Sequence, residues 1–197
     1  MLQKSVLRKL APSVLADEGY EEVRSRTGQG LLPGSRLIAR KAGVEVEIAV
    51  KVSAEGTLSF TKRTKTTWRT ASAVGLVLAI VPALDASAGI EILALDAKKL
   101  VAKFNAAWKA LEKAGRGVGF EQPVFVPIDK VTRKNVGHSV GNLTDCEIWR
   151  AQLSHDEVKR RTENRSDETF YQRVKREFAE HSGLDISKVE VVFRIKP

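Results

Sequence analysis

The sequence predicts a mixed α/β (α+β) domain in which helices flank a mixed central sheet. Residues 44–53 alternate apolar and polar side chains without a break, which is the two-residue period of a strand. Residues 75–81 form a continuous apolar run, typical of a strand buried on both faces. Residues 96–114 place apolar side chains at helical spacing after Asp96, a good capping residue. A chain of 197 residues with 43% hydrophobic residues is large enough for one such domain.

The remaining elements follow from local patterns. The first helix is expected over residues 2–16, with a kink or a late start because Pro12 removes a backbone donor, and Gly19 ends it. Strands are expected over 20–26, 36–40, 44–53 and 58–62, which continue one sheet, and over 90–95 and 189–195, with buried strands over 75–81 and 124–128. Further helices are expected over 96–114, from 154–157 onward, and over 167–182, where the helix is amphipathic. We therefore predict a core domain over residues 1–150 and a small helix–strand appendage over 151–197.

The charge is uneven along the chain. The net charge is +9, and residues 1–70 hold 13 Lys and Arg against 7 Asp and Glu, a net of +6. A basic N-terminal segment indicates an acidic partner, most commonly a nucleic-acid backbone, although the alternative is that the charge serves solubility alone. The single cysteine, Cys146, excludes an intrachain disulfide, and the broken apolar run over 71–97 does not suit a membrane span. We expect a cytoplasmic protein without a membrane partner.

Four short segments resemble one known family. They are Asp17-Glu18-Gly19-Tyr20-Glu21-Glu22-Val23, Gly28-Gln29-Gly30, Arg36-Leu37-Ile38-Ala39-Arg40 and Ile48-Ala49-Val50-Lys51-Val52-Ser53. Together they resemble the Mrr-type core of the restriction-endonuclease-like superfamily, also called PD-(D/E)xK, over residues 1–81. The resemblance implies a helix followed by three meandering strands. It also implies a metal-binding Asp that opens the second strand and a Glu-x-Lys on the third, which together would hold Mg²⁺ for phosphodiester cleavage.

This chain lacks the acids of that motif. Ser35 or Arg36 stands where the family has its Asp, and Ala49 stands where it has its Glu, so only Lys51 is in register. Glu47 lies on the same strand face, but about 13 Å from Lys51 along the strand. An arginine at position 36 favours a phosphate over a cation. The prediction is a catalytically degenerate nuclease fold without a metal cofactor that binds nucleic acid, with DNA as the expected form.

The phosphate contacts are expected from one strand face and one loop. The loop over residues 61–70 is basic, rich in threonine and carries an aromatic side chain for stacking, although a solvated loop with that side chain in the core is an equal reading. The residues expected to contact nucleic acid are Arg36, Arg40, Lys51, Lys62, Arg63, Lys65, Trp68 and Arg69.

Three alternatives remain open from the sequence. The first is an active Mg²⁺-dependent endonuclease that uses Lys51 with the relocated carboxylates Glu47 and Glu18. The second is a protein-interaction or homodimerisation module that acts through residues 154–197. The third is that residues 44–53 are an ordinary edge strand with a solvated, charged face.

Overall fold

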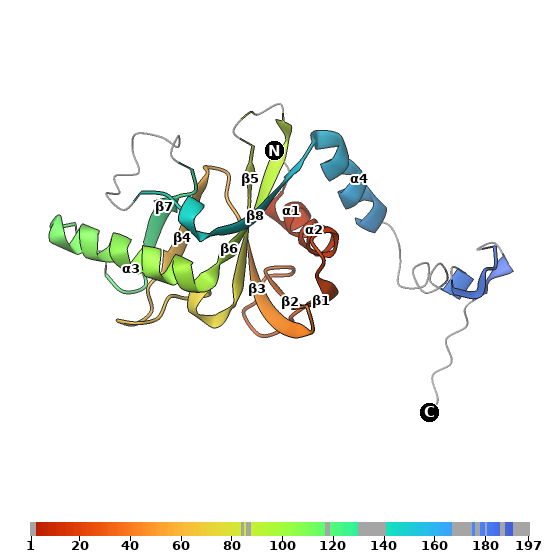
Figure 1. Cartoon of the computed structure of the whole chain (residues 1–197), viewed down its shortest axis with the longest axis horizontal. Coiled ribbons are helices and arrows are strands. Elements are labelled where there is room, and N and C mark those ends of the chain that lie inside the picture. The colour runs from red at the N-terminus through yellow and green to blue at the C-terminus, as the bar shows by residue number, and fades with distance from the viewer. Residues whose placement is uncertain are drawn as a thin grey trace.

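The computed structural model describes residues 3–83, 85, 88–116, 119–129, 141–166, 175, 178–179, 181–185 and 188–190. Its helices are α1 (Lys4–Arg8), α2 (Ala11–Asp17), α3 (Ala97–Lys113) and α4 (His155–Ser166), with short 3₁₀ helices η1 (Ala71–Ala73) and η3 (Thr144–Cys146). Its strands are β1 (Glu21–Ser25), β2 (Arg36–Lys41), β3 (Val44–Val52), β4 (Thr57–Thr61), β5 (Leu76–Pro82), β6 (Ile90–Asp96), β7 (Pro123–Pro127) and β8 (Glu147–Leu153). Figure 1 shows their arrangement.

The centre of the molecule is a six-stranded sheet in the order β1-β2-β3-β5-β6-β8. β3 and β5 are parallel, whereas the other neighbouring strands pair antiparallel. The predicted mixed central sheet is therefore confirmed. β3 lies inside this sheet between β2 and β5, so the alternative that it is an edge strand is wrong.

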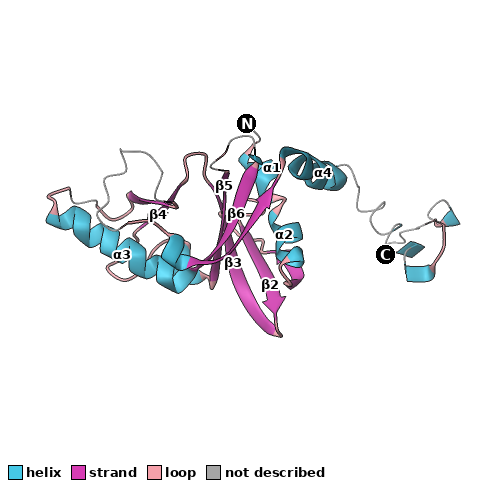
Figure 2. Ribbon diagram, turned by 45° about the horizontal axis from the view of Figure 1, so that its top comes forward, coloured by secondary structure: helices cyan, strands magenta, loops and turns pink. Residues whose placement is uncertain are grey.

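Two layers cover the sheet, one on each face. Figure 2 shows the sheet between α3 with β4 on one side and α1, α2 and α4 on the other. The first layer buries Phe60, Trp68 and Phe104 against the sheet residues Ala49 and Val77. The second layer buries α1, α2 and the start of α4 against the opposite side chains of the same strands. Both layers are needed because the central strands are apolar on both faces.

The expected first helix is divided into α1 and α2. Pro12 lies in the first turn of α2, where its missing N–H costs no helical hydrogen bond. The chain then ends α2 through Gly19, whose φ of 77° suits a residue without a side chain. The predicted interruption at Pro12 and the predicted stop at Gly19 are both confirmed.

Two later helices begin as predicted. Asp96 caps α3, with its carboxylate accepting a hydrogen bond of 2.8 Å from the Lys99 N–H. Ser154 and Glu157 form a reciprocal capping box at the start of α4. The Ser154 backbone and hydroxyl both donate to the Glu157 carboxylate and lower its pKa.

Three strands differ from what the sequence predicted. β4 does not continue the main sheet but pairs with β7 in a separate two-stranded sheet. β7 has the limits that its prolines predicted, but only Val124 and Val126 are fully buried, so just one of its faces is covered. β8 was not predicted at all, although the alternation of Trp149, Ala151 and Leu153 is its signal. The hydrophobic pattern alone did not show which strands pair.

The predicted boundary between residues 150 and 151 falls within β8. α4 also packs on the core, where Val158 is buried and Arg161 pairs with Asp17 of α2 at 2.6 Å. The predicted helix over 167–182 and the predicted strand over 189–195 lie largely outside the described residues. The division into two domains stays a prediction.

Candidate anion-binding site

The site lies where β2 begins beside β3. Arg36, the first residue of β2, is directly opposite Ala49 of β3, so both side chains lie on the same face of the sheet. Ala49 is fully buried in the cluster that contains Phe60 and Trp68. A carboxylate at position 49 would therefore enter an apolar layer, where a charge without a partner is very costly. Position 49 therefore holds a packed alanine, where the resemblance implies a metal-binding Glu.

Lys51 lies two residues further along β3 on the same face, past the point where β2 begins. Its ammonium lies 4.9 Å from the centre of the Phe60 ring, in a cation–π contact. Burial lowers the pKa of Lys51 below the ordinary value of 10.5. The positive charges that lower this pKa further belong, in order of effect, to Arg8, Arg36 and Lys4. The strand end is therefore a cluster of cations.

Two guanidinium groups of this cluster carry buried N–H groups without a hydrogen-bond partner among the described residues. These groups are Nε of Arg8 and Nη1 of Arg36. Gly34 lies close to Arg8, since an added Cβ would be 3.3 Å from the Arg8 Cβ. A buried donor without an acceptor costs about 1–3 kcal/mol, and more when it is charged. We call Arg8, Arg36 and Lys51 the cationic cluster.

A strained turn lies next to the cluster. Thr70 has φ 77° and ψ −60°, and the Ala71 N–H donates to the Arg69 carbonyl at 3.0 Å across it. This is a γ-turn of the positive-φ kind, which is rare and strained for a residue with a side chain. The Thr70 carbonyl accepts a hydrogen bond of 3.4 Å from Nη2 of Arg36. The turn thus joins the basic loop over 62–70 to the cationic cluster.

The carboxylates do not converge on Lys51. Glu47 forms a very short ion pair with Arg26, and its charge also raises the pKa of Arg36, which burial lowers. The Glu18 carbonyl accepts a hydrogen bond from Lys41 at the opposite end of β2. Lys41 pairs there with Val44, seven residues before Lys51, or about 23 Å along the strand. The Glu18 backbone therefore lies near the other end of β2, and the endonuclease alternative that uses Glu18 stays a prediction.

A divalent cation does not suit these residues. Magnesium requires oxygen ligands, usually carboxylates, whereas the described groups around Lys51 are guanidinium and ammonium groups. Among the described residues no three His, Cys, Asp or Glu side chains gather in a way that could hold a metal ion. The donor set favours an anion.

Two residues expected to bind nucleic acid are part of the core. Trp68 is 1% exposed, and its indole N–H donates to the Asn105 side chain at 2.9 Å, so the expectation that it stacks on a base is wrong. Lys62 is also buried, with its ammonium 4.4 Å from the Trp108 ring centre and 5.4 Å from that of Trp68. A lysine enclosed between two indole rings cannot reach a phosphate.

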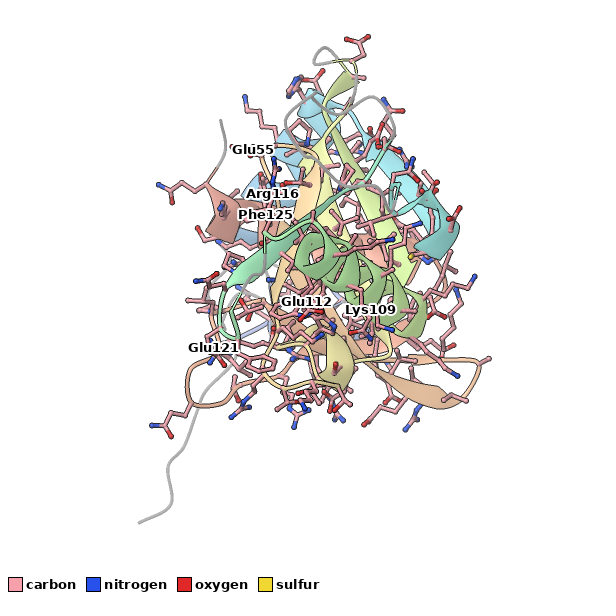
Figure 3. The ribbon with its side chains drawn as sticks, turned by 90° about the vertical axis from the view of Figure 1, so that its left-hand side faces the viewer. Glu55, Lys109, Glu112, Arg116, Glu121 and Phe125 are labelled. Carbon is pink, nitrogen blue, oxygen red and sulfur yellow. The ribbon has the colours of Figure 1, made fainter. Side chains whose placement is uncertain are left out.

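The environment of Lys62 also includes charges on α3. Figure 3 views the molecule from this side and labels Lys109 and Glu112. Burial lowers the pKa of Lys62, while Glu112 raises it and Lys109 lowers it. Lys62 therefore acts as a structural cation of the aromatic layer.

The other predicted cations of this set lie on the surface. Arg40 pairs with Glu22 at 3.1 Å, and Arg69 approaches Glu121 at 3.8 Å. Arg63 and Lys65 are exposed on the loop and form no ion pair within the described part of the chain. Arg63 and Lys65 therefore add positive charge to the surface of this loop.

Sequence reasoning identified Arg36 and Lys51 but missed Arg8, Lys4 and Thr70. Arg8 and Lys4 are separated from Lys51 by more than 40 residues, so no spacing rule could place them together. The excess of positive charge over residues 1–70 was their only signal.

No protein-family model matches this chain, and neither the curated proteins nor the solved structures contain a match. Among the described residues, every helix is too short or too polar to cross a membrane.

Proposed function

We propose that this protein binds nucleic acid, with DNA as the expected form, through phosphate contacts at the cationic cluster. The observation that carries the proposal is a pair of buried guanidinium N–H groups, on Arg8 and Arg36, that find no acceptor in the part of the chain that the structure describes; the partly buried ammonium of Lys51 belongs to the same cationic cluster. A phosphate oxygen supplies both an acceptor for those donors and a charge that offsets the repulsion among the cations.

The position of the cluster supports a degenerate nuclease scaffold. If the resemblance to the PD-(D/E)xK family holds, Lys51 matches the lysine of its motif, and Ser35 or Arg36 matches its metal-binding Asp. Ala49 is buried core and Arg36 is a cation, so the chain keeps a phosphate-binding group and lacks the metal-binding acids. The proposed protein therefore binds the nucleic-acid backbone without cutting it.

Phosphate contacts set the position of a nucleic acid without reading its sequence. Arg63 and Lys65 are further exposed cations, on the loop that precedes Thr70. Affinity should therefore depend little on base sequence and fall steeply with salt, because each neutralised phosphate releases a counterion.

The test is a fluorescence-anisotropy titration of short duplex and single-stranded DNA against salt. Removing one charged hydrogen bond costs about 1.5–3 kcal/mol, so Lys51→Ala or Arg36→Ala should weaken binding about tenfold or more. Each variant should also reduce the slope of log affinity against log salt by about one. Lys113→Ala, which removes an exposed lysine at the far end of α3, is the matched control and should bind like the wild type.

Absence of binding to both forms of DNA and to RNA at low salt would refute the proposal. The same samples incubated with Mg²⁺ or Mn²⁺ test the endonuclease alternative. Cleavage that is lost in Lys51→Ala would show that the chain is an active enzyme and that the scaffold is not degenerate.

A further inference from the structure

The loop between β1 and β2 ends in an exposed apolar tip. Leu32 is 61% exposed and Leu31 is 37% exposed, and Pro33 is exposed beside them. Exposed leucines are common singly, but two in succession followed by a proline form a small apolar projection. Neither the sheet nor the helices use these side chains.

The tip is held by a defined set of turns. The Leu31 N–H donates to the Gly28 carbonyl at 3.2 Å, and both the N–H and the hydroxyl of Ser35 donate to the Leu32 carbonyl, at 3.0 and 2.6 Å. Gly30 and Gly34 have φ values of 77° and 67°, which only glycine adopts without strain. The loop therefore presents its leucines from an ordered backbone.

The base of the same loop is cationic. Its two ends meet where the Arg26 N–H donates to the Arg36 carbonyl at 3.0 Å. Gly34 lies against Arg8, so two members of the cationic cluster lie directly under the loop. An apolar projection on a cationic base is complementary to a ligand with an anionic backbone and an apolar interior.

A nucleic acid fits this description better than a lipid surface. Two leucine side chains hold fewer carbon atoms than a single myristoyl chain, which by itself gives only marginal membrane binding. The N–H groups of Arg8 and Arg36 that need an acceptor are buried, so they suit one phosphate that enters the cluster more than a plane of head groups. Apolar side chains such as Leu and Pro insert between bases in proteins that bend DNA.

We propose that Leu31 and Leu32 form a wedge that inserts between adjacent bases while the cationic cluster holds the neighbouring phosphate. This inference rests on the proposed binding of nucleic acid. Insertion must unstack a base step, and this costs less at a mismatch or a gap. The protein should therefore prefer DNA that contains an easily opened step over a fully matched duplex of the same length.

The experiment uses the full chain and two short duplexes, one matched and one with a central mismatch, each carrying 2-aminopurine beside the central step. Wild-type protein should bind the mismatched duplex about tenfold more tightly. It should also raise the 2-aminopurine fluorescence, which increases when the base is unstacked. The double variant Leu31→Ser/Leu32→Ser should lose the preference and the fluorescence change, yet keep its affinity for matched DNA within about threefold.

Two controls separate the wedge from the phosphate site. Val44→Ser removes another exposed apolar side chain, 65% exposed at the far end of β3, and should behave like the wild type. Lys51→Ala should weaken binding to both duplexes equally. Circular dichroism of the leucine variants should match the wild type, because these loop side chains are exposed. The single variant Leu32→Ala should reduce the preference for the mismatched duplex in part.

A preference that survives in the double variant, or wild-type binding with no preference and no fluorescence change, overturns the wedge and leaves the proposed function standing. Absence of binding to either duplex overturns both. Leucine-dependent sedimentation with anionic phospholipid vesicles, without binding to DNA, would also overturn the wedge and identify the loop as a membrane contact.

Discussion

Lys51 combines two environments that oppose its charge. Its ammonium lies partly buried over the Phe60 ring, and the positive charges of Arg8 and Arg36 act on it. Both effects lower its pKa, because burial and like charges each destabilise the protonated form. An anion bound at this site reverses the second effect and raises the pKa of Lys51 again. Ligand binding and protonation are therefore coupled at this residue.

The sign of this coupling gives a prediction for pH. Lys51 keeps its proton to a higher pH in the complex with DNA than in the free protein. The affinity for DNA is therefore greatest below the lowered pKa that Lys51 has in the free protein. It falls as the pH rises through that value, in a window below the ordinary lysine pKa of 10.5. Anisotropy titrations of DNA at a series of alkaline pH values should show this loss in the wild type.

Lys51→Arg provides the control for that prediction, because a guanidinium stays charged throughout this range. The variant should bind with nearly constant affinity across the same pH series. An identical loss of affinity in both proteins would show that another group titrates and that Lys51 is not the ligand.

Individual elements begin and end through local chemistry. α3 is the long helix that covers the Phe60 and Trp68 layer, and its first turn depends on the Asp96 carboxylate. This carboxylate satisfies a backbone N–H that has no partner within the helix, and its negative charge lies at the positive end of the helix dipole. The start of α3 therefore depends on one side chain.

Asp96→Ala should lower the free energy of unfolding by about 1 kcal/mol, because it removes the cap. Urea denaturation monitored by circular dichroism measures this loss. Asp96→Asn keeps a capping oxygen and should stay within about 0.5 kcal/mol of the wild type. Equal losses in the two variants would show that the helix dipole outweighs the capping hydrogen bond.

At the scale of the whole molecule, one arginine joins the two sheets. Arg150 of β8 pairs with Glu91 of β6 at 2.7 Å, with Glu147 at 2.8 Å and with Asp129, just after β7, at 2.9 Å. The hydrogen bonds that Arg150 donates to Glu147 and Asp129 raise its pKa. All four side chains are largely buried, so the arginine compensates three carboxylates that would otherwise repel one another.

Arg150→Met should lower the free energy of unfolding by about 3 kcal/mol at neutral pH, because it leaves buried carboxylates without a counter-charge. Urea denaturation monitored by circular dichroism also measures this loss.

Arg150→Lys keeps one positive charge but loses the forked geometry, so its free energy of unfolding should fall between those of the wild type and Arg150→Met. No loss of stability in Arg150→Met, which keeps an apolar stem, would show that packing of the arginine stem, and not its charge, joins the sheets.

Local patterns in the sequence determined most of the elements. The alternation over 44–53, the apolar run over 75–81 and the cap at Asp96 each specify a strand or a helix through contacts between near neighbours. Prolines 123 and 127 specified the limits of β7 in the same way, because proline cannot donate in a ladder.

Only the tertiary structure decided which strands pair and which cations meet. β4 leaves the main sheet for β7, Trp68 enters the core and Arg8 reaches the end of β3, and none of these follows from spacing along the chain. The physical reason is that the two-residue period of a strand determines which of its side chains share a face of the sheet. Which strands and side chains pack against that face depends on contacts between segments far apart in sequence. The sequence by itself determined a basic α/β chain with a lysine at position 51 of an alternating strand, and folding decided that this lysine lies within the electrostatic reach of Arg8 and Arg36.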